Sequence, residues 1–152
     1  MKRKDLWMVN TDVEVIKTIG DTQSYLVRMG ANKIATHFDE KTREPIALYF
    51  TMSVNGEDIP FQLPARVEAI YKILHQGRNS SEQERDRSQA KRVAWRHIYR
   101  WIQAQLAMIE TGMLAAEEVM TPYIQVDIDT SLYQRLAAGG LKRLLPASTE
   151  TK

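Results

Sequence analysis

Apolar residues recur at two different periods along the chain, and the change of period divides it into strands and helices. Between residues 33 and 63 the chain is rich in β-branched and aromatic residues, or its apolar residues alternate at period two, which predicts three strands. These strands are Lys33 to Phe38, Ile46 to Val54 and Ile59 to Leu63. A polar segment separates the first two, and Asn55-Gly56 is a strong hairpin turn between the second and third. The chain therefore predicts a three-stranded antiparallel meander. Because Pro60 lacks a backbone N–H, we expect the third strand to be an edge strand or Pro60 to stand among its first residues.

Helical periodicity precedes and follows these strands. A first helix is predicted from Ile19 to Met29, capped by Thr18 and ended by Gly30, after a short strand at Val13 to Val15. After residue 63 the period becomes 3.6. The further predicted helices cover Pro64 to Gly77, Ser81 to Glu110, Leu114 to Met120 and Ser131 to Ala138, with a strand at Tyr123 to Ile128 before the last.

Together these elements predict an α+β protein in which a three-stranded antiparallel meander packs against helices, one long helix lying in the C-terminal half. The length of 152 residues suits one domain, for which we expect residues 1–145, with a flexible tail at residues 146–152. The absence of cysteine excludes disulfides and thiolate chemistry. No apolar run is long enough to span a bilayer or to serve as a secretory signal, so we expect a cytoplasmic protein of a bacterial host.

Positive charge is concentrated in the middle of the chain. The net charge is only +2, but residues 61–112 carry nine lysines and arginines against five aspartates and glutamates. On the long helix, one broad face is apolar, and Arg85, Arg92, Arg96 and Arg100 fall close together on the opposite face with Tyr99 at its margin. No acidic residue occurs from Arg87 to Ile109, so these arginines repel one another without local compensation.

Two interpretations of this arginine row stay open. The first is a nucleic-acid interface in which the four guanidinium groups contact phosphates and Tyr99 stacks on a base or sugar. The second is a solvated face, or arginines paired with acids of another element. The acids considered for such pairing are Glu117, Glu118, Asp127 and Asp129.

The apolar face of the long helix contains Trp95 and Trp101, for which the spacing favours core packing over base stacking. The alternative function depends on this face. It is a protein-interaction module or inhibitor that binds a host or phage protein through the Trp/Met-rich surface. A face this broad could also form the interface of a homo-oligomer.

Catalytic and metal sites have little support in the sequence. His37, Asp39 and Glu40 form a loose cluster without metal-ligand spacing, so no metal is predicted. Asp127 and Asp129 would share one strand face, as in a two-metal nuclease, but a turn that caps the helix after Ser131 explains them better. No glycine-rich phosphate loop or serine-nucleophile motif is present. We therefore expect no cofactor and favour a protein that is not an enzyme.

Two stretches carry a family resemblance. They are Ile59-Pro-Phe-Gln-Leu-Pro64, and the run from Ala94-Trp95 through Trp101 to Met113 followed by Pro122-Tyr123. Together they resemble a largely uncharacterised family of small bacteriophage- and prophage-encoded proteins. The resemblance implies a phage setting and carries no active-site assignment. The function predicted from the sequence is a non-enzymatic phage accessory protein that binds nucleic acid, DNA rather than RNA, through the basic helix face.

Overall fold

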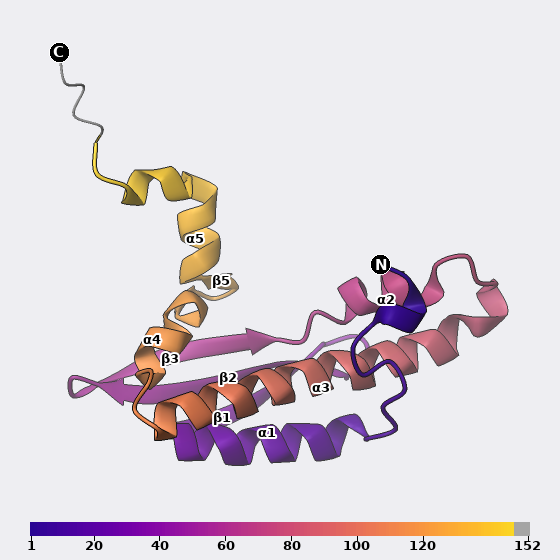
Figure 1. Cartoon of the computed structure of the whole chain (residues 1–152), viewed down its shortest axis with the longest axis horizontal. Coiled ribbons are helices and arrows are strands. Elements are labelled where there is room, and N and C mark those ends of the chain that lie inside the picture. The colour runs from indigo at the N-terminus through magenta and orange to yellow at the C-terminus, as the bar shows by residue number, and fades with distance from the viewer. Residues whose placement is uncertain (148–152) are drawn as a thin grey trace.

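The computed structural model describes residues 1–147 and has two layers (Figure 1). One layer is an antiparallel sheet of order β1-β2-β3, formed by β1 (Ala31–Phe38), β2 (Pro45–Val54) and β3 (Glu57–Pro64). The other contains α1 (Val15–Met29) and α3 (Gln83–Glu110), which lie side by side across one face of the sheet. The predicted α+β class and three-stranded meander are confirmed.

The register of the sheet decides which side chains meet the helices. Phe50 of the central strand pairs with Ile34 on one side and Phe61 on the other, and the Phe50 and Phe61 rings stack with centroids 5.3 Å apart. Alternate residues of β2 point to opposite faces. Leu48, Phe50 and Met52 are therefore buried under the helices, whereas Tyr49 is on the outer face and partly exposed.

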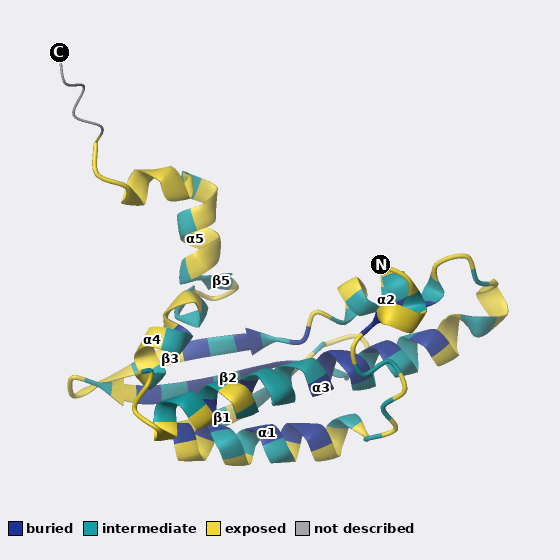
Figure 2. Ribbon diagram, viewed as in Figure 1, coloured by how far each residue is buried: buried dark blue, intermediate teal, exposed yellow. Residues whose placement is uncertain are grey.

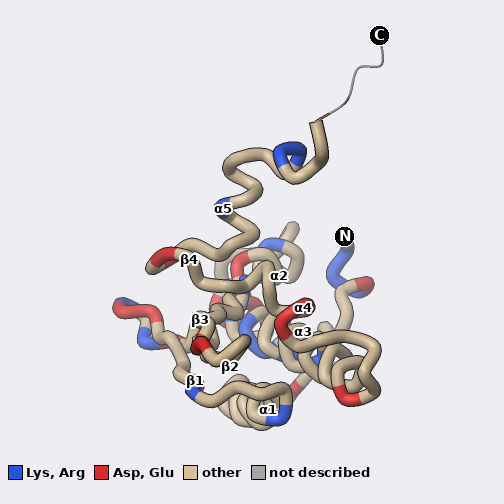
Figure 3. The backbone as a smooth tube through the Cα atoms, turned by 90° about the vertical axis from the view of Figure 1, so that its left-hand side faces the viewer, with Lys and Arg blue, Asp and Glu red and all other residues tan. Residues whose placement is uncertain are grey.

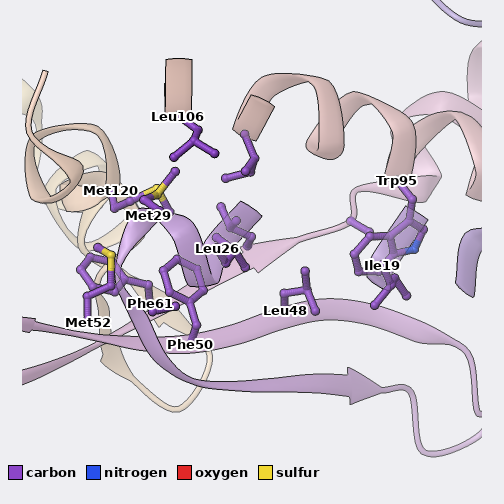
Figure 4. Packing of buried hydrophobic residues seen from close by; sticks show 14 residues of the cluster. Ile19, Leu26, Met29, Leu48, Phe50, Met52, Phe61, Trp95, Leu106 and Met120 are labelled. Atoms are coloured by element: carbon purple, nitrogen blue, oxygen red, sulfur yellow. The ribbon is translucent and has the colours of Figure 1, made fainter. Parts of the chain in front are cut away.

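The main core fills the space between the two layers (Figure 4). Leu26 of α1 and Trp95 of α3 are completely buried there, together with Leu48 and Phe61 of the sheet. Figure 2 shows that the buried positions of α1 and α3 form the stripes that face the strands. Burial of these side chains, rather than helix propensity, holds α1 and α3 in place.

A second, smaller core joins α3 to α2 (Val67–His75) and to the N-terminal segment. Leu6, Leu74, Ala90 and Val93 are its buried residues. Because Leu6 is fixed in this cluster, residues 3–9 run over α3 near its first half instead of extending into solvent. The N-terminal segment is therefore part of the folded unit.

Beyond α3 the chain forms a C-terminal arm that rises past the β3 edge of the sheet (Figure 1). The arm contains α4 (Ala116–Met120), the short strands β4 (Gln125–Asp127) and β5 (Thr130–Ser131), and α5 (Leu132–Gly139). Met120 is buried in the main core, and Ile124 forms an isolated bridge with Phe61. No residue of α5 is buried, so the arm is anchored at its base.

Several predicted boundaries need correction. The strand predicted at Val13 to Val15 is wrong, because Glu14 is the N-cap residue of α1 and Thr18 is buried inside the helix. The helix predicted from Pro64 begins only at Val67, since Pro64 still pairs with Ala47 in the sheet. Pro60 lies on an edge strand, which was the first of the two alternatives predicted for it. The predicted tail begins at residue 146, and residues 148–152 of it lie outside the described part.

Candidate nucleic-acid interface

The arginine row, defined as Arg85, Arg92, Arg96 and Arg100, lies on the side of α3 that faces α1 and solvent. Helical spacing of three or four residues makes Arg92, Arg96 and Arg100 neighbours. The structure brings the row together but gives its members different surroundings. Arg85 is exposed, Arg92 and Arg100 are half-buried, and only 8% of Arg96 is exposed.

Arg92 has an acidic partner from α1. Its Nη2 lies 3.2 Å from Glu14 Oε1, and its Nη1 donates to Gln89 Oε1 at 3.2 Å. For Arg92 the second interpretation therefore applies, although the acid is Glu14 rather than any of those considered from the sequence. Glu14 is largely exposed, so the pair is a weak surface ion pair that another anion can replace at little cost.

Arg96 is buried between α3 and α1, where its guanidinium lies over the Tyr99 ring at 4.2 Å. Tyr99 in turn stacks on Tyr25 of α1, with ring centroids 5.3 Å apart and the two hydroxyls 3.4 Å apart. The hydrogen bond with Tyr25, burial and the Tyr25 charge raise the pKa of Tyr99, although Arg96 and Arg100 oppose the shift. Tyr99 therefore belongs to the α1–α3 contact, and the expectation that it is open for stacking on a base does not hold.

The remaining two members of the row keep an uncompensated charge. Among residues 1–147, neither Arg85 nor Arg100 forms an ion pair, and Arg100 Nη1 donates only to the neutral Gln103 Oε1, at 2.7 Å. Arg96 likewise has no acidic partner in the described chain. Arg85 and Arg92 also line a polar cleft of about 560 Å³ between α3 and the N-terminal segment, together with the acids Asp12 and Glu14. Arg85 and Arg100 can thus contact an external anion, whereas Arg96 contributes its charge from a buried position.

The two tryptophans of α3 have different roles. Trp95 is completely buried in the main core, as predicted. Trp101 is only partly buried and lines a second cleft of about 740 Å³, within the range typical of ligand sites. We call it the β3-edge cleft. Its lining includes Gln62, Arg66, Trp101, Tyr123, Asp129 and Tyr133.

The β3-edge cleft joins aromatic walls to polar groups. Trp101 and Tyr123 meet edge to face, with ring centroids 5.4 Å apart, and Tyr133 of α5 is 52% exposed. Arg66, the exposed N-cap residue of α2, forms no ion pair within the described chain. Burial raises the pKa of the Tyr49 phenol on the outer face of the sheet, and the negative charge of Asp129 adds to the shift.

His97 connects the cleft to the N-terminal segment. Its Nε2–H donates to the Trp7 carbonyl oxygen at 2.7 Å, and its ring stacks on the Trp7 ring with centroids 5.1 Å apart. No local pattern in the sequence predicted the cleft, because its walls come from β3, the start of α2, α3 and the C-terminal arm. A possible signal was the spacing of His97 and Trp101, which are one helical turn apart at the margin of the apolar face.

A buried carboxylate, Asp86, fixes the first turn of α3. Asp86 Oδ1 accepts a hydrogen bond from Arg3 Nη1 at 2.9 Å, and His75 Nδ1 lies 3.0 Å from Oδ2. Arg78 Nε lies 2.8 Å from Oδ2 without hydrogen-bond geometry, so that contact is electrostatic. Desolvation works against ionisation, but the hydrogen bonds of His75 and Arg3 and the charges of Arg78 and Arg3 outweigh it and lower the pKa of Asp86.

The residues considered for catalysis or metal binding have structural explanations. Asp39 accepts hydrogen bonds from the backbone and side chain of Thr42, which lower its pKa, and His37 packs against Tyr49. Asp127 and Asp129 flank Ile128 in the tight β4–β5 turn, and Ser131 caps α5 by accepting from Gln134 N. No group of three or more histidine, aspartate or glutamate side chains in residues 1–147 is arranged to hold a metal ion.

The fold and the two clefts define a two-layer α+β protein with a cationic helix side and an aromatic groove. Lysines and arginines are visible on the N-terminal segment, α1 and α5 as well (Figure 3). The chain matches no known family model, no curated protein and no solved structure. In the described part, none of the helices has the length and apolar character needed to cross a lipid bilayer.

Proposed function

We propose that this protein is a non-enzymatic accessory protein that binds nucleic acid, DNA in preference to RNA, through the solvent side of α3. The observation that carries the proposal is that three of the four members of the arginine row have no direct acidic partner in the described part of the chain. Arg85, Arg96 and Arg100 have no acidic partner within residues 1–147, and α3 has no acid from Arg87 to Ile109. Polyanions whose phosphates are regularly spaced suit such a row.

Each arginine has a distinct part in this proposal. Arg85 and Arg100 contact phosphates directly. Arg92 exchanges the carboxylate of Glu14 for a phosphate, which is favoured because the pair with Glu14 is exposed and weak. Arg96 is held against Tyr99 and raises the local positive potential without needing to move. Tyr99 positions Arg96 and is not a base-stacking residue in this arrangement.

The phage setting implied by the family resemblance is part of the proposal. Protein binding through the Trp/Met-rich face has less support, because Trp95, Ile102 and Leu106 of that face are buried in the protein's own core. Nuclease activity at Asp127 and Asp129 also has less support, since the two carboxylates flank a turn residue and have no further ligand beside them in the described chain.

The test is fluorescence anisotropy with labelled single- and double-stranded DNA and RNA at two salt concentrations. The variant Arg85→Gln/Arg100→Gln removes two cations that belong to neither hydrophobic core. We expect weaker binding and a salt slope, log K against log[salt], that is shallower by about two.

The matched control is Lys41→Gln/Arg43→Gln, which lowers the net charge equally on the β1–β2 turn, where both residues are exposed. This control should retain the affinity and slope of the unmodified protein. If both double variants lost the same affinity and the same salt slope, net charge alone would explain the binding, and a specific role of the row would be contradicted. Absence of binding to every nucleic acid would end the proposal.

A further inference from the structure

The β3-edge cleft and the arginine row lie on adjoining sides of the same helix. His97 is one helical turn from both Arg100 and Trp101, whereas Arg100 and Trp101 themselves point about 100° apart. His97 and Trp101 line the cleft, and Arg100 donates to Gln103 on the α1 side. A strand bound along the row therefore has to pass around α3 at His97 to reach the cleft.

The chemistry of the cleft suits a planar heterocycle. Trp101, Tyr123 and Tyr133 supply three aromatic side chains, and the half-exposed ring of Tyr133 is open to a stacking partner. Aromatic side chains stack on every base, because each base has a π face. Gln62 and Gln134 add amide groups, and Asp129 adds a carboxylate that accepts hydrogen bonds from base amino groups.

The charge at the cleft mouth suits a nucleotide that is still attached to its backbone. Arg66 lines the cleft at the start of α2 and forms no ion pair in the part of the chain that the structure describes. This cation can contact a phosphate beside an inserted base. The carboxylate of Asp129, within the cleft, would repel a phosphate there and leaves that space to the base.

We infer that the β3-edge cleft is a base-binding subsite for single-stranded nucleic acid, in which an unpaired base stacks on the aromatic walls while Arg66 contacts a flanking phosphate. The inference rests on the proposed function and adds strand selectivity to it. Bases of an intact duplex are stacked and paired, so they cannot enter a recessed groove without unpairing. The arginine row alone would accept single and double strands alike.

The test compares a labelled single-stranded DNA with an abasic strand of the same length, which keeps the phosphates and sugars but has no bases. The unmodified protein should bind the base-bearing strand about tenfold more tightly, since one stacked base contributes on this scale. Tyr133→Ala should abolish the difference, and Tyr133→Phe should preserve it because the phenyl ring still stacks. Tyr133 is half-exposed, so the alanine variant leaves the core intact.

Phe38→Ala is the matched control, because Phe38 is a similarly exposed aromatic residue at the end of β1 and outside the cleft. It should retain the preference for the base-bearing strand. Equal binding of the base-bearing and abasic strands by the unmodified protein would overturn the base-binding subsite and leave the proposed function standing. Binding to no strand at all would overturn both. The inference would also be overturned if Tyr133→Ala kept the preference for the base-bearing strand. It would be overturned as well if free mononucleotides at equal concentration displaced the strand.

Discussion

Asp86→Asn should destabilise the protein more than any other single replacement of a charged residue on α3. The substitution preserves the shape of the side chain but removes the buried negative charge that Arg3, His75 and Arg78 share, and leaves only the partly exposed Glu82 beside Arg78. It also replaces one carboxylate oxygen by an amide nitrogen, which donates toward groups that themselves donate. Because Asp86 is fully buried, water cannot compensate for the lost interactions.

The expected loss follows from the exposure of the partners. Removing one member of a buried ion pair costs roughly 3–5 kcal/mol. Arg3, His75 and Arg78 are between 23% and 35% exposed, so water can solvate them again after the change. We therefore expect the lower limit, about 3 kcal/mol, which corresponds to a fall in Tm of roughly 6–12 °C for a chain of this size.

Urea unfolding followed by circular dichroism measures this loss, and its pH dependence gives a second check. The pKa of Asp86 is lowered in the folded state. Its stabilisation is therefore present above the ordinary aspartate pKa of about 3.9 and is lost as the pH falls through the folded value. The difference between the unmodified protein and Asp86→Asn should be full at neutral pH and shrink in acid. A loss below about 1 kcal/mol at pH 7, or a difference independent of pH, would refute the assigned ion cluster.

Three further predictions concern the turn, the core and the arginine row. Gly56→Ala should cost about 1 kcal/mol in thermal unfolding, because Gly56 has a φ of +83° in the Asn55-Gly56 turn and a methyl group meets no other contact there. Phe61→Ala should lower the free energy of unfolding by about 3–5 kcal/mol in urea titrations, since its ring is buried between the sheet and the helices. Glu14→Gln should change stability by less than about 1 kcal/mol but strengthen nucleic-acid binding in the anisotropy assay, because it releases Arg92. Unchanged affinity in this last variant would argue against a phosphate contact by Arg92.

Most of the architecture could be predicted because it depends on local signals. The alternation of β-branched and aromatic residues, the Asn55-Gly56 turn and Pro60 identified the meander and its edge strand. The end of α1 at Gly30 was also predicted from the sequence, and Gly30 has the left-handed conformation expected there, with a φ of +117°. The start of α1 was missed because no side chain caps it, and burial of Ile19 against the sheet stabilises the helix instead.

The candidate site was predicted only in part, and the reason lies in long-range packing. Helical spacing correctly grouped the arginine row on one side of α3. It could not show that α1 would lie along this side, where Tyr25 covers Tyr99 and Glu14 pairs with Arg92. In the sequence, Asp86 resembles any acid in the first turn of a helix. It is a buried, ion-paired carboxylate only because Arg3, His75 and Arg78 pack around it in the folded chain.

The sequence by itself determined the α+β class, the strand order of the meander, the length of α3 and the grouping of its arginines, because periodicity and turn residues act over a few positions. The tertiary structure alone decided which of those arginines are buried, paired or open to solvent. It also created the β3-edge cleft, whose walls at Arg66, Trp101 and Tyr133 are separated along the chain and meet only when the C-terminal arm packs beside β3. Side-chain environment depends on contacts between distant segments, which no local pattern encodes.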